Sequence, residues 1–298
     1  TTTLSYPVVD AYGKLLVLLV RMVKGAGGAQ DPAASLAARL AMLNKVLSTI
    51  TRVLIADYET KAAATVAGGA GAGGAAAAAA PSFDQRPYFR LLLGLLQDIN
   101  KPNPTLDSSN LQVLAAFATA FHSLQPSVCP GFAYAWLELV SHRTFMPSLL
   151  LVKGQKGWQL MHRLLVDLFS FMEPLLRRSG LSDAVRALYK GMLRTLLVLL
   201  HDFPEFLCDY HFSLCDVIPP SCIQLRNLVL SAFPRTMRLP DPFTPNLKVD
   251  LLPEIAQAPR VLSNFAQALT HNGLRTDLDK YLHTRQSPEF LLELPARL

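Results

Sequence analysis

Hydrophobic positions along most of this chain recur at intervals of three and four residues, which is the spacing of one face of an α-helix. The longest unbroken stripe lies between residues 36 and 54. A helix carrying this stripe can begin at Asp31 and Pro32, because aspartate caps free backbone N–H groups and proline suits the first turn. No stretch shows the alternation of apolar and polar residues that is typical of a strand. The pattern therefore predicts an all-α fold.

Short loops separate the predicted helices, and this favours antiparallel pairs packed into a stack. The pattern predicts helices over residues 8–23, 31–61, 88–99, 111–124, 132–141, 144–152, 158–178, 184–200, 204–212 and 222–233, and three short ones near residues 261–269, 274–283 and 288–294. Such a stack is HEAT-like, or α-solenoid-like. Because no repeat of about 40–47 residues is visible, we expect an irregular HEAT-like stack of antiparallel helix pairs.

Two segments interrupt this pattern. Residues 62–81 consist almost entirely of Ala and Gly, and we expect a flexible loop there, because Gly makes a helix costly and Ala offers little to bury. Residues 1–61 would then form an N-terminal helix pair and residues 82–298 the main helical stack, with the whole chain as one scaffold domain. Residues 239–253 are proline-rich and predict an extended segment near the C-terminus. This segment can clamp its own domain or present side chains to a partner.

Composition adds a reason to look for a binding surface. Of the 298 residues, 51% are hydrophobic and 17% are charged, whereas the usual charged share is about 25%. Either the core is large, or apolar side chains are exposed on a surface that binds a partner. No apolar run is long enough to predict a membrane span. The first residue is Thr and no signal pattern follows it, so we expect a fragment of a longer chain. Four cysteines are too few for a disulfide framework, and we expect a cytoplasmic and nuclear protein.

The motifs of common catalytic and metal chemistry are missing. Residues 154–157 read GQKG, but the rest of a phosphate-binding loop is absent, and a helix–helix turn is the favoured interpretation. Cys208, His211, Cys215 and Cys222 could ligate zinc, but their spacing matches no common zinc pattern, and buried cysteine is the favoured interpretation. No nucleophile elbow, HExxH motif or carboxylate pair is visible. We expect no enzymatic activity, no cofactor and no metal.

A basic stripe runs along one predicted helix. Arg186, Lys190 and Arg194 are spaced by four residues and share a face, and the net charge of the chain is +6. The stripe is either a solvated face or a docking strip for acidic peptide or RNA phosphate. Aromatic residues that would stack on bases are not interleaved with it, so a peptide is favoured over RNA.

A long block near the C-terminus resembles a known family. The block reads HDFPEFLCDYHFSLCDVIPPSCIQLRNLVLSAFP (201–234) followed by RTMRLPDPFTPNLKVDLL (235–252), with further similarity in RPYFRLLLGLLQDI (86–99) and HRTFMPSLL (142–150). These segments resemble the C-terminal Not-type superfamily-homology domain of the large scaffold subunit of the Ccr–Not mRNA deadenylase complex. The resemblance covers about residues 7–298 except the Ala/Gly segment, which favours a divergent, fungal member.

The resemblance implies a HEAT-like stack without catalytic activity that serves mRNA deadenylation, mRNA decay and translational repression. Its implied partners are the N-terminal extended regions of the two smaller Not-box subunits and, in some lineages, short motifs of translational repressors. We expect a monomeric fragment and no membrane partner. The candidate contact residues in the matching segments are Phe145, Met146, Phe203, Tyr210, Arg235, Arg238, Phe243 and Asn246. For Phe203 and Tyr210 a core position is the alternative, and for the whole chain the alternative function is a basic helical platform that binds RNA directly.

Overall fold

All regular structure in the described part of the chain is helical. The computed structural model describes residues 6–23, 32–69, 82–101, 110–178, 180–235, 237, 241, 243–252, 269–270, 273–285 and 288–297. Its α-helices are α1 (Tyr6–Met22), α2 (Pro32–Gly69), α3 (Arg86–Ile99), α4 (Asn110–Ser123), α5 (Ala133–Val140), α6 (Met146–Leu150), α7 (Trp158–Leu176), α8 (Asp183–Asp202), α9 (Pro204–Val217), α10 (Ile223–Leu230), α12 (Arg275–Thr284) and α13 (Pro288–Arg297). The all-α prediction is confirmed.

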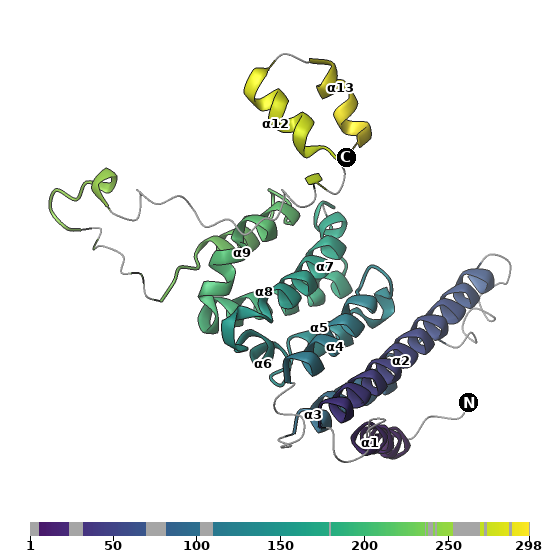
Figure 1. Ribbon diagram of the computed structural model, residues 1–298. Helices are drawn as coiled ribbons and strands as arrows, with labels where there is room; N and C mark the ends of the chain where they lie inside the picture. The colour runs from purple at the N-terminus through teal and green to yellow at the C-terminus, as the bar shows by residue number, and fades with distance from the viewer. Residues whose placement is uncertain are drawn as a thin grey trace.

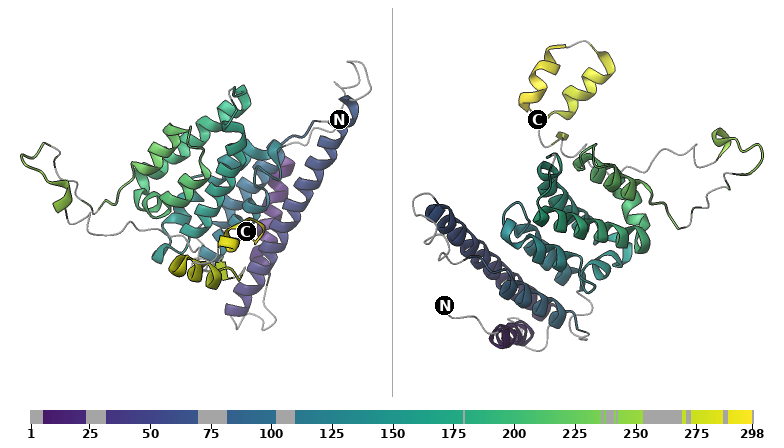
Figure 2. Two further views of the ribbon diagram at one scale, coloured as in Figure 1. Left: turned by 90° about the horizontal axis from the view of Figure 1, so that it is seen from above. Right: turned by 180° about the vertical axis from the view of Figure 1, so that it is seen from behind.

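The helices form two layers (Figure 1). In one layer α1 packs on α3, α3 on α5, α5 on α8 and α8 on α10. In the other layer α2 packs on α4, α4 on α7 and α7 on α9. Contacts of α1 with α2, and of α9 with both α8 and α10, join the layers. This is the arrangement of an α-solenoid, and the predicted HEAT-like stack is confirmed. Figure 2 shows α2 running along one flank of the stack.

Helix α2 is longer than predicted. The helix continues past Lys61 and ends at Gly69, so the flexible loop expected over residues 62–81 is wrong for residues 62–69. Residues 62–67 read AAATVA, and Ala is the strongest helix former, so the first Gly, at position 68, is also the first residue that opposes the helix. Residues 70–81 lie outside the described part of the chain.

Helix α9 also continues beyond its predicted end at residue 212. Leu214 and Cys215 are buried and extend the apolar face that packs on α7. The helix ends at Val217, just before Pro219 and Pro220, because proline cannot supply the N–H that the next turn requires. The predicted helix near residues 261–269 lies almost wholly outside the described residues.

One continuous core runs through the stack, from Leu16 in α1 to Val229 in α10. Trp136 and Phe121 are among its largest fully buried side chains. The Trp136 indole Nε1–H donates to the Phe121 carbonyl at 2.7 Å, so its one polar group is satisfied inside the core. Among the described residues, no helix is both long and apolar enough to cross a bilayer.

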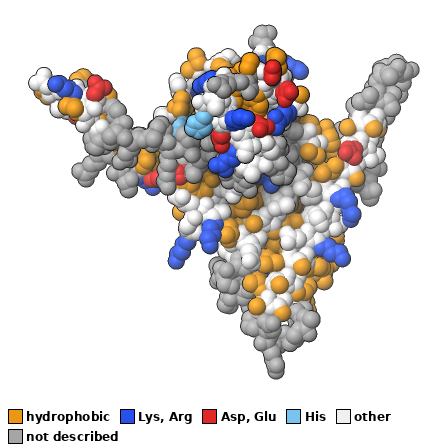
Figure 3. Space-filling view, turned by 45° about the horizontal axis from the view of Figure 1, so that its top comes forward, with side chains coloured by type: hydrophobic (Ala, Val, Ile, Leu, Met, Phe, Trp, Pro, Cys, Tyr) orange, Lys and Arg blue, Asp and Glu red, His pale blue; other side chains and the backbone are white. Residues whose placement is uncertain are grey.

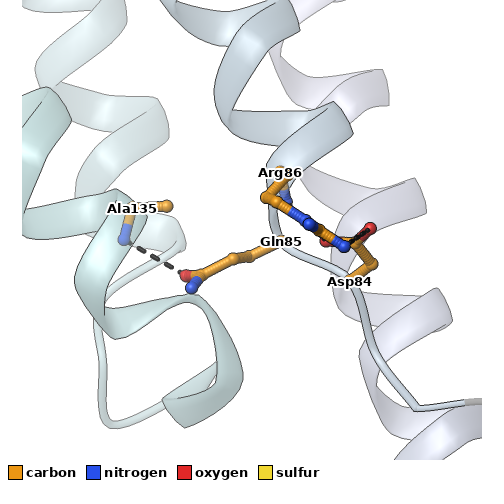
Figure 4. A network of polar contacts seen from close by, with 4 residues as sticks. All are labelled: Asp84, Gln85, Arg86 and Ala135. Carbon is orange, nitrogen blue, oxygen red and sulfur yellow. Dashed lines mark hydrogen bonds and ion pairs between the residues drawn. The ribbon is translucent and has the colours of Figure 1, made fainter. Parts of the chain in front are cut away.

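A polar bridge fixes the start of α3 against α5 (Figure 4). The side-chain Oε1 of Gln85, just before α3, accepts from the backbone N–H of Ala135 at 3.2 Å. That N–H lies in the first turn of α5, where no carbonyl of the same helix can accept from it. On the other side of Gln85, Arg86 and Asp84 form an exposed ion pair of 2.9 Å. The bridge sets the spacing of two neighbouring helices in one layer.

Both ends of the stack leave apolar side chains exposed. On α1 they lie opposite its buried face, and they are Val8, Tyr12, Leu15, Leu18, Leu19 and Met22. At the other end they are Phe212 on α9 and Ile223 and Leu230 on α10. Figure 3 shows charged side chains gathered at the C-terminal hairpin of α12 and α13, and fewer of them over the N-terminal part.

Candidate protein-binding surface

The basic stripe lies on the surface of α8. Arg186, Lys190 and Arg194 are all exposed. Arg186 is held weakly, with its Nη1 3.9 Å from an Asp183 carboxylate oxygen, while in the described part of the chain Lys190 and Arg194 have no ion pair. Further along the same helix, Leu197 and Val198 are exposed. The face therefore combines cations with apolar side chains, which suits a protein chain better than RNA.

Arg235 is tied to the end of α8. Its guanidinium Nη2 donates to the carbonyl oxygens of His201 and Asp202, each at 2.8 Å. Its backbone N–H donates to a carboxylate oxygen of Glu205 in α9 at 3.1 Å. A cation at a helix C-terminus satisfies free carbonyls and complements the helix dipole. Arg235 thus fixes where the chain leaves the stack, and these contacts occupy its Nη2 group and its backbone N–H.

The segment beyond Arg235 carries some of the most exposed large apolar side chains in this half of the chain. Phe243 is 89% exposed and Leu251 is 76% exposed, and Figure 1 draws residues 243–252 away from the helical layers. The segment is only partly extended, since Phe243 N–H donates to the Asp241 carboxylate at 3.0 Å and residues 249–251 form one 3-10 turn. Asn246 is exposed with φ +59°, a left-handed conformation that asparagine tolerates better than most residues.

Phe203 and Tyr210 are half-buried: Phe203 lies between α8 and α9, and Tyr210 lies within α9. The Phe203 N–H donates to the Leu199 carbonyl at 2.8 Å. The Tyr210 ring stacks on His162 with centroids 4.3 Å apart and packs on Phe206. Burial raises the pKa of the Tyr210 hydroxyl. Both residues are partly committed to the core, with only their remaining surface open to a partner.

Two of the candidates are core residues, and the expectation that they contact a partner is wrong for this fold. Phe145 and Met146 are buried, and the Phe145 ring packs edge-to-face on Phe121 with centroids 5.0 Å apart. Similarity in residues 142–150 therefore reflects packing between α4 and α6. Arg238 lies outside the described residues.

The possible zinc ligands are engaged otherwise. His211 Nδ1 lies 2.6 Å from the Cys208 carbonyl oxygen, within hydrogen-bond distance. Burial raises the pKa of the thiols of Cys208 and Cys215, which disfavours the thiolate that zinc needs. No group of three or more His, Cys, Asp or Glu side chains suited to a metal lies within the described ranges.

A histidine of α7, His162, contacts a serine of α9, Ser213. His162 Nε2 lies 2.7 Å from Ser213 Oγ. Ser213 Oγ also lies 3.1 Å from the Tyr210 carbonyl oxygen, within hydrogen-bond distance. Burial lowers the pKa of His162. The contact joins α7 to α9 inside the stack.

Comparison with known proteins decides the family. Residues 96–298 match the family model described as CCR4-Not complex component, Not1. The chain belongs to the Not1 family. The resemblance found in the sequence is thereby confirmed, while a fungal source stays a prediction.

Curated Not1-family relatives match over most of the chain. The CCR4-NOT transcription complex subunit let-711 of Caenorhabditis elegans is 39% identical over 98% of the chain. The general negative regulator of transcription subunit 1 is 36% identical over 67% of the chain in Saccharomyces cerevisiae and 32% identical over 91% in Schizosaccharomyces pombe. The chain spans only 10% to 12% of the length of these relatives.

Two solved structures share the fold. The NOT1 superfamily homology domain from Chaetomium thermophilum superposes with a TM-score of 0.73 at 28% identity, over 93% of this chain and 49% of the other. A Not1 C-terminal domain in complex with Not4 superposes with a TM-score of 0.68 at 27% identity, over 99% of this chain and 55% of the other. The Not1-family fold thus extends over both the N-terminal helix pair and the main stack.

Sequence reasoning missed the apolar faces at the two ends of the stack. The signal was present in α1, where Leu and Val occupy nearly every side of the helix between residues 15 and 20. A helix that is apolar all round is normally buried all round, yet only one side of α1 is covered. At the C-terminal end, Ile223 and Leu230 lie seven residues apart and therefore on one face of α10.

Proposed function

We propose that this chain is a non-catalytic protein-binding domain that docks extended N-terminal regions of the two smaller Not-box subunits. Within a CCR4-Not complex it would act in mRNA deadenylation, decay and translational repression, in the cytoplasm and the nucleus. Short motifs of translational repressors would use the same kind of surface. The solved complex of a Not1 C-terminal domain with Not4 supports protein binding by this fold.

The observation that carries the proposal is the exposed apolar segment that follows Arg235. Phe243, Val249 and Leu251 are exposed on a stretch whose exit from the stack is fixed by Arg235. Large apolar side chains left in water are unfavourable, and a patch of them indicates an interaction site. A disordered partner region gains affinity by covering such a surface, because its ordering entropy must be offset by burial.

The proposal is tested with the purified chain and the N-terminal extended regions of the two Not-box subunits. Replacing Phe243 and Leu251 together by Asp removes two exposed apolar groups without touching the core. We expect the affinity measured by calorimetry to fall by about tenfold or more, as for truncation of interface hot spots.

A matched control is Leu292→Asp, because Leu292 is equally exposed but lies on α13. Its affinity for both regions should equal that of the unmodified chain. If the unmodified chain binds neither region, the proposed function is wrong. If the double variant binds as tightly as the control, the function stands and the assignment to residues 243–251 fails.

Direct RNA binding is the second candidate, because Lys190 and Arg194 on α8 have no ion pair with any described residue. It predicts an affinity for RNA that falls steeply with salt, since each phosphate contact releases counterions. Reversing both residues to Glu should then abolish RNA binding. Retained RNA binding in this variant, or none in the unmodified chain, would remove the candidate.

A further inference from the structure

A groove lies between α2 and α4, in the layer opposite to the basic stripe. Its volume is about 780 Å³. It is lined by the face of α2 that runs from Asn44 to Glu59 and by Ala116, Thr119, Ala120 and Ser123 of α4. The α2 wall spans fifteen steps of the helix, from Asn44 to Glu59, which is about 22 Å at a rise of 1.5 Å per residue. The groove is thus about as long as four turns of an α-helix.

The wall formed by α4 is built of small side chains. Ala116, Thr119, Ala120 and Ser123 follow the three- and four-residue spacing of one helix face. Side chains of this size allow another backbone to approach closely, as at close helix–helix contacts. The hydroxyls of Thr119 and Ser123 donate to carbonyls of their own helix, so both are satisfied without a ligand.

Thr51 differs from the other hydroxyl residues of the groove. Its side chain is among the groove residues and is 7% exposed, and its Oγ1 has no hydrogen-bond partner among the described residues. Buried polar groups are nearly always paired, and each exception requires an explanation. Because this oxygen is also sealed from the surface, it belongs to the wall behind the groove and is not a contact point for a ligand.

Two opposite charges mark the groove along α2. Arg52 and Glu59 are exposed and lie seven residues apart, which places them on the same side of the helix about 10 Å apart. Within the described part of the chain neither makes an ion pair, whereas the nearby Lys61 and Asp57 pair at 2.9 Å. A ligand complementary to these two side chains carries one acidic and one basic group about 10 Å apart.

We propose that this groove binds an amphipathic α-helix of a protein partner. The helix has about 15 residues, the length that covers the α2 wall. It turns small side chains toward α4, and it places an acidic residue at Arg52 and a basic residue at Glu59. RNA is disfavoured, because the groove offers one cation next to one anion. The site is separate from residues 235–251 and does not depend on the function proposed for them.

The test uses three synthetic fluorescent peptides and the 298-residue chain. Each peptide is an alanine-rich helix of about 16 residues with two charged positions seven apart on its small face. The mixed peptide carries Glu and Lys there, the acidic one two Glu and the basic one two Lys. Fluorescence anisotropy should show that the unmodified chain prefers the mixed peptide, whichever direction the helix takes. Arg52→Glu should shift the preference to the basic peptide and Glu59→Arg to the acidic one, each by about fivefold to tenfold.

Filling the groove gives a second, charge-free test. Thr119 is exposed, and Thr119→Trp places an indole over the small wall; it should weaken all three peptides by about tenfold or more. The matched control is Thr49→Trp, because Thr49 is exposed on α2 outside the groove and has the same type of hydroxyl contact with its own helix. Lys45→Glu controls for net charge, since it makes the same change as Arg52→Glu outside the groove residues.

The result that supports the proposal is a preference that follows Arg52 and Glu59 and is lost with Thr119→Trp. Equal binding of the three peptides, or a shift in Lys45→Glu as large as in Arg52→Glu, would overturn it. Binding of an RNA oligonucleotide that Arg52→Glu removes would replace the helix by RNA. A concentration-dependent dimer in sedimentation that Thr119→Trp abolishes would identify a second copy of the chain as the occupant.

Discussion

His162 lies where α7 meets α9, stacked on Tyr210 and in contact with Ser213. Its pKa in the folded chain is lowered, because burial disfavours the charged imidazole. The unfolded chain takes up this proton near pH 6.5, so below that pH the unfolded state binds more protons than the folded state. The free energy of unfolding must therefore fall as the pH drops through and below 6.5.

The substitution His162→Gln keeps a polar side chain at this position but removes the titrating imidazole. We expect denaturant unfolding at pH 7.5 and pH 5.5 to show a smaller acid loss of stability in the variant. Some loss remains, because burial and the neighbouring Arg143 also lower the pKa of His142. If the unmodified chain and His162→Gln lost the same stability, His162 would have the same pKa in the folded and the unfolded chain.

At the scale of elements, the junction between α6 and α7 depends on one close approach. A Cβ atom on Gly157 would lie 2.0 Å from the carbonyl oxygen of Leu149, a distance that no packing adjustment of side chains relieves. The backbone of Gly157 is itself ordinary, with φ −85°. Glycine is thus needed here for space and not for conformation.

The corresponding prediction is that Gly157→Ala lowers the free energy of unfolding by about 2 kcal/mol or more, because the backbone of α6 must shift to admit a methyl group. Gly180→Ala is the control, since nothing lies within 4 Å of its added Cβ, and its effect should stay within about 0.5 kcal/mol. Chemical denaturation of both variants is the measurement. Equal effects of the two substitutions would mean that α6 moves freely.

At the scale of the whole molecule, the described residues cover the first helix of the stack on one side only. The exposed side of α1 carries Tyr12, Leu15 and Leu19 among other apolar residues. Patches of this kind promote association. We expect the isolated chain to associate weakly through this face at high concentration, and to be monomeric when dilute.

Replacing Leu15 and Leu19 together by Lys should suppress this association, measured by static light scattering over a concentration series. The midpoint of thermal unfolding should stay nearly unchanged, because both side chains are about half exposed already. Scattering that is equal in the variant and the unmodified chain would locate the contact elsewhere, for example at α10.

The fold could be predicted because helical periodicity is a local property. Stripes such as Leu43, Leu47 and Leu54 place a buried face without knowledge of what covers it. The errors came where local rules compete. In residues 62–69 the helix preference of Ala outweighed its weak burial, and in α9 the apolar face continued to Val217.

The candidate surface was less predictable, because exposure depends on the packing of distant segments. Phe145 and Phe243 are both aromatic residues in family-like segments, yet the first is buried under Phe121 and the second lies in solvent. The role of Arg235 required the position of the end of α8. The groove required α4 to lie beside α2, which no stripe on either helix reveals.

The attachment of Arg235 also has a mechanical meaning. A partner that pulls on residues 243–251 would load α8 and α9 at Arg235, because its three hydrogen bonds end on His201, Asp202 and Glu205 of these helices. The pull would then be shared by α8, α9 and α10, and α10 would not carry it alone.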